Sequence, residues 1–386
     1  MDKFITLFLV IGFGLGATYK FSLFSPEIKV SLLDFGVLIS TLLCLTRNPR
    51  ILLHNKLFRP IMLFGAVSLF SLLLSFSRYG PISLLVGLSY ILRWLLYSLF
   101  AVSLSQFIKP SSASQLFVKL GLLTVLIGLA QYLLIPDIRP LEAFDWDPHY
   151  FRVVAQFLDP GFTGLILVFT LIKITLTPLA TKYHFLAWSS TYLAMALTYS
   201  RASYLAFLVA MAVIAVKLKG AKFFLKMLVL LTITIIVLPR PGGEGVRLER
   251  TNSLLARVYN WRNSLTVWKD HPVLGTGFNL YRYVQRDYGF LNENWRENHA
   301  GAGADSSLFF VLATTGILGA SAYVWYLISL SRLKFMPFFL LPLLAHSFFL
   351  NSLFYPPVLL LLGLITAGSL PSTPVGSDSK PGQSPR

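Results

Sequence analysis

The sequence predicts an all-α, polytopic membrane protein with about twelve transmembrane helices. Hydrophobic residues make up 55% of the 386 positions and charged residues only 13%, about half of the roughly 25% charged content of soluble domains. A soluble chain of this length would leave much of that apolar surface in water. Apolar runs of about 17 to 25 residues, the length that crosses a bilayer, also recur along the chain. Together these observations exclude a soluble globular protein.

The apolar runs are rich in Leu, Phe, Val and Ile and contain almost no charge. This composition suits helices that satisfy every backbone polar group within their own segment. The first run follows Lys3 and resembles a signal peptide, but no convincing small-residue cleavage site follows it, so it is interpreted as the first helix. The predicted spans lie near 4–19, 30–46, 60–77, 82–107, 114–135, 161–178, 184–199, 202–217, 222–239, 304–330, 335–353 and 356–371.

The Lys and Arg residues predict the orientation of these spans. Fourteen lie in the inner connections and six in the short outer connections of this arrangement. The positive-inside rule therefore places both termini in the cytoplasm. The same distribution accounts for the net charge of +17, so that charge does not indicate a nucleic-acid partner. We expect a multi-pass protein of the cell inner or plasma membrane, in contact with the lipid bilayer.

The predicted membrane domain covers residues 1–371. It contains a smaller outer loop at 136–160 and a large extracytoplasmic loop at 240–303, and loops of that length are usually functional. Residues 372–386 are rich in Pro, Ser and Gly and are predicted to form a disordered cytoplasmic tail. The single cysteine excludes an intramolecular disulfide, and the six histidines include no close pair, so no metal cofactor is expected.

The large loop contains one clear helical pattern. Five apolar residues recur at spacings of 4, 3, 4 and 3, which places them on one face of a helix. His271-Pro272 ends this helix. Cations flank the apolar face, which is typical of a helix lying in the membrane interface. Packing on the tops of the spans is the alternative, and the two interpretations are compatible. The five residues are Leu254, Val258, Trp261, Leu265 and Trp268.

Several arginines are candidates for function. Arg152, Arg201 and Arg257 all lie on the predicted outer side, and guanidinium groups bind diphosphate oxygens through bidentate, charge-assisted hydrogen bonds. For each of them taken alone, an interfacial arginine that extends to the membrane surface is the alternative. Arg93 lies in the middle of a span, where a charge is functional by default, although pairing with Asp34 would make it structural.

Four segments carry a family resemblance. They are residues 152–164 (RVVAQFLDPGFTG), 198–203 (TYSRAS), 257–278 (RVYNWRNSLTVWKDHPVLGTGF) and 305–319 (DSSLFFVLATTGILG). In order and content they resemble the O-antigen ligase and polymerase family, bacterial membrane enzymes that move glycans from a polyprenyl-diphosphate carrier to an acceptor. The resemblance covers roughly residues 140–355.

The resemblance implies a metal-independent glycosyltransferase, either a ligase or a polymerase, that needs no cofactor. Its donor would be a polyprenyl-diphosphate-linked glycan and its acceptor a glycan, lipid or protein. Arg152 and Arg201, together with Arg257, would bind the diphosphate on the extracytoplasmic face. Trp146, Tyr150 and Trp295 are candidates for stacking on sugar rings, although aromatic residues at this depth are also common interface anchors.

One departure from the family pattern concerns the catalytic base. The family begins the fourth segment with His-Asn, and its two glycines follow the His by eleven and fourteen residues. Gly316 and Gly319 keep that spacing here, so Asp305 occupies the His position. Asp305 is one candidate base, since a carboxylate near apolar surface has a raised pKa. His299 is a second candidate, and in a third interpretation Asp305 only caps the following helix.

Two functions of other classes compete with this one. A transporter or flippase of polyprenyl-linked sugars also needs many spans and cationic residues, but it should carry polar residues along a path through the bilayer. The predicted spans are nearly free of charge apart from Asp34 and Arg93, which favours the transferase. The other alternative is a non-catalytic scaffold of envelope assembly.

Overall fold

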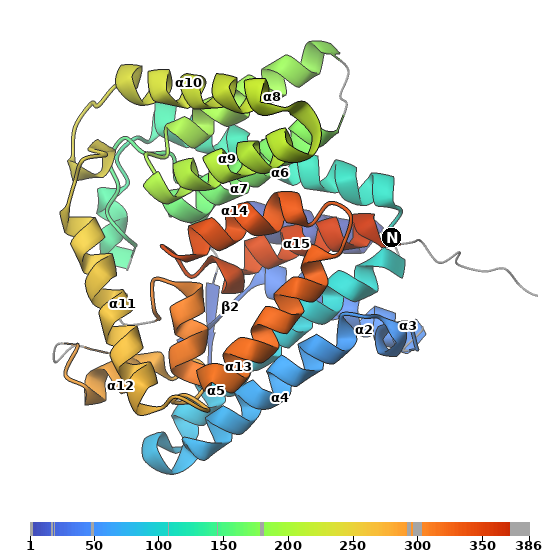
Figure 1. Cartoon of the computed structure of the whole chain (residues 1–386), viewed down its shortest axis with the longest axis vertical. Coiled ribbons are helices and arrows are strands. Elements are labelled where there is room, and N and C mark those ends of the chain that lie inside the picture. Colours follow the sequence, from blue (N-terminus) through green and yellow to red (C-terminus); the bar gives the residue numbers. More distant parts are fainter. Residues whose placement is uncertain are drawn as a thin grey trace, which may run out of the picture.

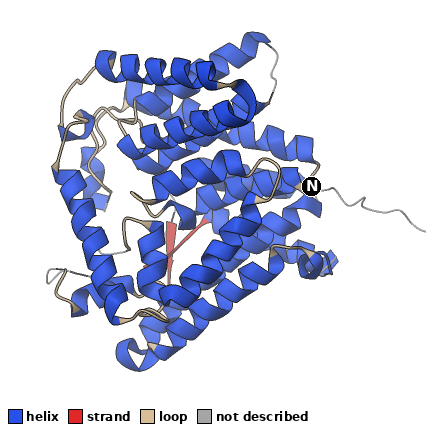
Figure 2. Ribbon diagram, in the orientation of Figure 1, coloured by secondary structure: helices blue, strands red, loops and turns tan. Residues whose placement is uncertain are grey.

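The computed structural model describes residues 3–16, 18, 20–47, 50–106, 108–144, 146–177, 181–291, 295 and 303–370. It is a mostly helical bundle with one small sheet near its centre (Figures 1 and 2). The predicted tail at 372–386 lies outside the described residues, as does His299.

Within the described residues, a helix occupies each of the predicted apolar runs. A protein interior and a bilayer both favour this outcome, because a helix satisfies its own backbone groups. The helices are α1 (Lys3–Leu15), α2 (Leu32–Arg47), α4 (Phe58–Leu74), α5 (Phe76–Ser103), α6 (Pro110–Leu134), α7 (Pro160–Leu176), α8 (Thr181–Ala196), α9 (Arg201–Ile214), α10 (Ala221–Val237), α13 (Ser307–Ser331), α14 (Pro337–Ser347) and α15 (Pro356–Ser369).

Helix formation does not by itself establish that a segment crosses the membrane. Among the described residues, four helices are long and apolar enough to do so: α5, α6, α13, and α9 with its π-helical extension to Lys219. Six further apolar helices are 10–17 residues long. These findings support a membrane protein, while the number of twelve spans stays a prediction.

The all-α prediction is wrong at residues 20–31. Strands β1 (Lys20–Leu23) and β2 (Ser25–Ser31) form an antiparallel hairpin between α1 and α2. Pro26 disfavours a helix interior, because it lacks a backbone N–H, and the β-branched Ile28 and Val30 favour a strand. Ile28 is buried in this hairpin. The predicted span at 30–46 accordingly begins as a helix only at Leu32.

Helix α14 is shorter than the predicted span at 335–353. It ends at Ser347, and its 11 residues would extend only about 16 Å. The chain then forms a turn and a short 3-10 helix over Ser352–Phe354 before α15 begins at Pro356. The polar residues Asn351 and Ser352 lie where the turn meets the 3-10 helix. The predicted span at 335–353 is therefore a helix of 11 residues followed by a turn.

The large loop contains helix α11 (Asn252–Asp270) and the short helix α12 (Tyr281–Asp287). α11 packs against α13 and crosses one edge of the bundle, transverse to α9 and α14 (Figure 1). A short helix, α3 (Arg50–His54), joins α2 to α4.

The Pro-x-x-Gly-x-Gly segment at 272–277 attaches the large loop to the bundle. It runs beside an interruption of α13 at Gly316, where φ is 62° and ψ is −165°. A Cβ on Gly316 would lie 2.3 Å from the carbonyl carbon of Val273, and one on Gly275 would lie 2.4 Å from that of Thr314. Four backbone hydrogen bonds replace those that the break removes. They are Thr276 N to Ala313 O, Gly277 N to Thr314 O, Ile317 N to Pro272 O and Leu318 N to Val273 O.

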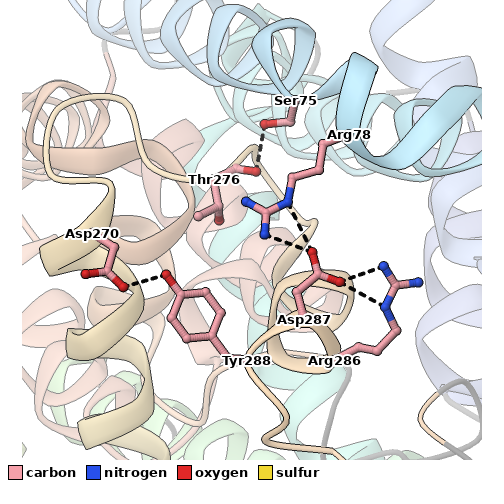
Figure 3. A network of polar contacts seen from close by, with 7 residues as sticks. All are labelled: Ser75, Arg78, Asp270, Thr276, Arg286, Asp287 and Tyr288. Carbon is pink, nitrogen blue, oxygen red and sulfur yellow. Dashed lines mark hydrogen bonds and ion pairs between the residues drawn. The ribbon is translucent and has the colours of Figure 1, made fainter.

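A second attachment lies where α4 meets α5 (Figure 3). Arg78 contacts Asp287 at the end of α12, at 3.0 Å, and Asp287 also pairs with Arg286 at 2.6 Å. Ser75 Oγ donates to the carbonyl of Thr276 at 2.8 Å. In the same view, Tyr288 donates to Asp270, the last residue of α11. These contacts fix the second half of the large loop on the bundle.

Candidate functional site

Helix α11 buries one face against the protein. Ser264 and Val267 are buried on that face. The apolar residues of the predicted stripe are less covered, since Leu254 is 44% exposed and Val258 is 48% exposed. The helix therefore packs on α13 with one face and presents apolar side chains outward with another. This arrangement agrees with both interpretations of the sequence pattern.

Arg152 joins three segments of the chain. It is buried, and its Nε donates to the carbonyl of Thr198 at 2.9 Å while Nη2 lies 3.5 Å from the carbonyl of Tyr199. Its Cδ also lies close to Gly245 of the large loop. The smaller outer loop, the turn before α9 and the large loop therefore meet at this side chain.

Arg201 contacts the same part of the large loop. It is the first residue of α9, whose N-cap is Ser200. Its Nη1 donates to the carbonyls of Leu248 at 3.2 Å and Arg250 at 2.9 Å, and its Nη2 donates to Ser253 Oγ at 2.7 Å. Arg152 thus contacts residues 198–199, directly before Arg201 in the chain. Both arginines also contact the large loop within residues 245–253.

Two further arginines complete what we call the arginine cluster, which consists of Arg152, Arg201, Arg250 and Arg257. Burial and then the charge of Arg250 lower the pKa of Arg152 to about 9. Burial, Arg201 and Arg257 lower the pKa of Arg250. Each guanidinium remains charged at neutral pH. Arg250 also donates to the carbonyl of Gly245, at 2.7 Å, beside the Arg152 side chain. The four cations therefore lie close enough to affect one another.

Two aspartates lie in the same neighbourhood. Burial raises the pKa of Asp159, and the charge of Arg152 opposes that rise. Burial also raises the pKa of Asp305, and there Arg257 opposes it. Burial lowers the pKa of Arg257, and the charges of Asp305 and Asp159 oppose that fall. The charges of Glu244 and Glu249 act on Arg250 as well, so the four arginines lie among acidic side chains of the large loop as well as these two aspartates.

Asp305 does not cap α13. The cap is Ser306, whose side chain accepts from the backbone N–H of Phe309. Asp305 instead donates its own N–H to Asn260 Oδ1 of α11, at 2.9 Å. The capping interpretation of Asp305 is therefore wrong, because the next residue provides the cap. The other candidate base, His299, lies outside the described residues.

The N-terminal ends of three helices meet beside the cluster. Asp159 caps α7 by accepting from Phe162 N at 2.7 Å, Ser200 caps α9, and Ser306 caps α13. The carbonyl of Gly161 in α7 accepts from Ser203 of α9 and lies 3.1 Å from His346 Nε2 of α14. Helix N-termini carry partial positive charge, so they add to the attraction of this region for anions.

Arg93 makes its contacts away from the arginine cluster. Its Nε lies 3.2 Å from Asp34 Oδ1, and Tyr97 donates to the same carboxylate oxygen at 3.1 Å. A second guanidinium nitrogen donates to the carbonyl of Lys29 in the hairpin. The alternative of a structural pair with Asp34 therefore accounts for this arginine, which links α2, α5 and β2.

The three candidate stacking residues are dispersed. Trp146 packs near Ile138 and lies under Lys20, whose Nζ is 4.9 Å from the ring centroid. Tyr150 lies under Arg139 at 4.4 Å, and Trp295 lies under Arg286 at 5.0 Å. Each ring thus already contacts a cation, and the structure provides no shared surface of these three residues as evidence for sugar stacking.

Sequence reasoning missed Asp159, Arg250 and His149. Asp159-Pro160 before an apolar run is a recognisable helix start, but that signal does not reveal the neighbouring arginines. Arg250 is one of several cations in the large loop and has no distinctive spacing. His149 is buried beside Arg152 and Arg250, and burial followed by these charges lowers its pKa to about 3. It is therefore neutral at physiological pH.

A comparison with protein families bears on this arrangement. Residues 185–324 match the O-antigen ligase family model. The match confirms the resemblance predicted from the sequence, and it includes the turn at Arg201, all of α11, the 272–277 segment and Asp305. Arg152 and Asp159 lie outside the matched residues. No curated protein matches the chain. The O-antigen ligase match and the apolar helices support a membrane protein of polysaccharide biosynthesis.

Proposed function

We propose that this protein is a bacterial envelope glycosyltransferase, an O-antigen ligase-like enzyme or a polysaccharide polymerase. It moves a glycan from a polyprenyl-diphosphate carrier to the hydroxyl of a glycan, lipid or protein acceptor. The observation that carries the proposal is the arginine cluster, in which four guanidinium groups from distant segments gather beside three helix N-termini.

The charge of the cluster suits the donor. A diphosphate diester carries one negative charge on each phosphate, and guanidinium groups bind such oxygens through charge-assisted hydrogen bonds. The acceptor oxygen attacks the anomeric carbon, and the bond between that carbon and the diphosphate oxygen breaks with its electron pair on the diphosphate. The leaving group gains negative charge in this step. Fixed guanidinium groups stabilise that charge most strongly in the transition state.

The acceptor hydroxyl must lose a proton as it attacks. Asp305 is our candidate for the base, with His299 as the alternative. The raised pKa of Asp305 supports this role, because a base works best when its pKa lies nearer the operating pH. Arg257 lies close enough to Asp305 to limit the rise, which keeps the carboxylate available to accept the proton.

The cations of the cluster take the place of a metal ion in this proposal, and no cofactor takes part. We place the enzyme in the cell inner or plasma membrane with both termini in the cytoplasm and the cluster on the extracytoplasmic face. The apolar side chains exposed on α11 support a position in the membrane interface. A transporter of polyprenyl-linked sugars and a non-catalytic scaffold remain the competing functions.

Purified protein incubated in lipid vesicles with the lipid-linked glycan tests these possibilities. A new glycosidic product supports the transferase, movement of intact donor across the bilayer supports the transporter, and neither result supports the scaffold. Arg152→Ala and Arg201→Ala should each abolish product formation while the protein is still made. Arg139→Ala is the matched control, because Arg139 lies in the same outer loop but pairs with Asp137 at the surface. Full activity of both cluster variants would contradict the proposal.

A further inference from the structure

Three segments surround the ring of Phe349, near the segment that contains Asp305. Trp261 of α11 lies 5.8 Å from Phe349 and 5.9 Å from Phe309, measured between ring centroids. The Arg257 guanidinium lies 5.7 Å from the Phe349 centroid. Asn351 belongs to the turn after α14, and its amide nitrogen would lie 3.6 Å from a Cβ on Gly303. Since Gly303 is two residues before Asp305, all these side chains share one neighbourhood.

Two polar atoms in this neighbourhood are buried without a hydrogen-bond partner among the described residues. They are the indole Nε1 of Trp261 and the amide Oδ1 of Asn351. Unpaired buried polar atoms destabilise a folded protein and call for an explanation, such as a water, an ion or another bound molecule. On the same helix, Trp268 Nε1 does find a partner, donating to the carbonyl of Pro272 at 3.3 Å.

The two unpaired atoms have complementary character. The indole nitrogen is a donor and the amide oxygen is an acceptor. Asp305 lies in the same neighbourhood and offers a carboxylate. Its backbone N–H is held by a hydrogen bond to Asn260. The rings of Trp261, Phe309 and Phe349 supply an apolar surface. A sugar ring carries hydroxyl groups that both donate and accept, and it has an apolar face of C–H groups, so it matches this set.

We propose that Trp261 and Asn351 form a subsite for the acceptor sugar, next to Asp305. The Trp261 N–H donates to one ring hydroxyl, Asn351 Oδ1 accepts from another, and the attacking hydroxyl lies toward Asp305. This inference rests on the proposed glycan transfer. Among the possible acceptors it favours a sugar residue, whose hydroxyl groups and apolar face match this set, over a lipid chain, which would leave both atoms unpaired.

Substitutions of Trp261 and Asn351 can distinguish a role in acceptor binding from a role in protein stability. Trp261→Phe keeps an aromatic ring and removes the N–H, while Asn351→Leu keeps the approximate shape and removes the amide. Because neither atom has a partner to lose in the ligand-free protein, we expect both variants to keep or slightly raise the wild-type Tm. Loss of one hydrogen bond should raise the acceptor KM about three- to tenfold. The donor KM should stay within about twofold of wild type.

The assay uses the full chain in lipid vesicles, with lipid-linked glycan and acceptor glycan both extracted from a strain that lacks the protein. Each substrate is varied separately. Trp268→Phe is the matched control, since it removes an indole N–H that has a partner. It should lower Tm and leave the acceptor KM unchanged.

Wild-type acceptor KM in both Trp261→Phe and Asn351→Leu would overturn the subsite, as would an equal rise in donor and acceptor KM. Failure of the wild-type protein to transfer glycan would instead contradict the proposed function. The two failures are therefore distinguishable in one experiment.

Discussion

Two arginine-rich regions hold the large loop on the bundle, and they handle charge in opposite ways. In the network of Figure 3, Arg78 and Arg286 share the carboxylate of Asp287 near the surface. In the arginine cluster, Arg152 and Arg201 bind backbone carbonyls and a serine hydroxyl. Carbonyls satisfy the donors but do not cancel the charge. The first region is therefore a structural attachment, and the second keeps positive charge available for an anion.

The largest expected effect is the loss of the cluster cations. Arg201→Ala or Arg152→Ala should lower the rate of glycan transfer at least a hundredfold, about the effect of removing one fixed donor from a transition-state site. Arg201→Lys should recover only part of the rate, because an ammonium lacks the bidentate geometry. The glycan-transfer rates of the purified variants, compared with the rate of the wild type, test both expectations. A rate for Arg201→Ala within a few-fold of wild type would remove the distinction between the two regions.

Loss of the candidate base should follow in size. Asp305→Asn should slow transfer about a hundredfold or more. In the wild type, the rate should fall as the pH drops through the raised pKa of Asp305, because protonation removes the base. A pH–rate profile compares the two proteins. An unchanged rate in Asp305→Asn would leave His299 as the candidate.

The stability of the protein should depend on pH in the opposite sense to its transfer rate, because ionised Asp305 supports transfer but destabilises the fold. A carboxyl whose pKa is raised on folding binds protons more tightly in the folded state, so its contribution to stability falls as pH rises from the usual aspartate value through the raised one. Asp305→Asn should remove that pH dependence and slightly increase Tm at neutral pH. A lower Tm at neutral pH would show that the ionised carboxylate stabilises the fold.

The backbone attachment between residues 272–277 and α13 should give a smaller but clear effect on stability. Gly316→Ala forces a side chain into a positive φ and against Val273, which should cost about 2 kcal/mol or more in the free energy of unfolding. Gly289→Ala is the control, since Gly289 also has a positive φ but no atom within 4 Å of an added Cβ. Its cost should be about 1 kcal/mol. Equal losses in thermal unfolding would show that close packing is not what requires Gly316.

The smallest effect should come from the paired network. Arg78→Ala removes an ion pair whose arginine is 46% exposed, and such pairs contribute about 0.2–1 kcal/mol. Transfer should stay within about twofold of wild type, and the loss in Tm should shrink as salt is added. A large loss of transfer would mean that Arg78 also takes part in substrate binding.

The sequence patterns predicted helices well where the signal is local. Apolar runs gave the helical segments, because length and composition decide whether a segment can be a buried helix. They did not predict the hairpin of residues 20–31, which lies mostly between two predicted spans, or the early end of α14, where Asn351 lies near the end of an otherwise apolar stretch. Periodicity in α11 located the helix, but packing on α13 decided which of its faces is buried.

The candidate site was only partly predictable for a different reason. Arg152, Arg201 and Arg257 stand out in segments that resemble the family, and the structure places them together. Arg250, Asp159 and the unpaired atoms of Trp261 and Asn351 depend on contacts between residues far apart in the chain. No spacing in the sequence encodes such contacts.

Binding of polyprenyl diphosphate to the purified protein tests the central claim most directly. Wild-type protein and Arg78→Ala should bind it with similar affinity, and raised salt should weaken both. Arg152→Ala and Arg201→Ala should each weaken binding about tenfold or more, the loss expected for one charge-assisted contact. Equal binding by all four proteins would contradict the assignment of the arginine cluster to the diphosphate.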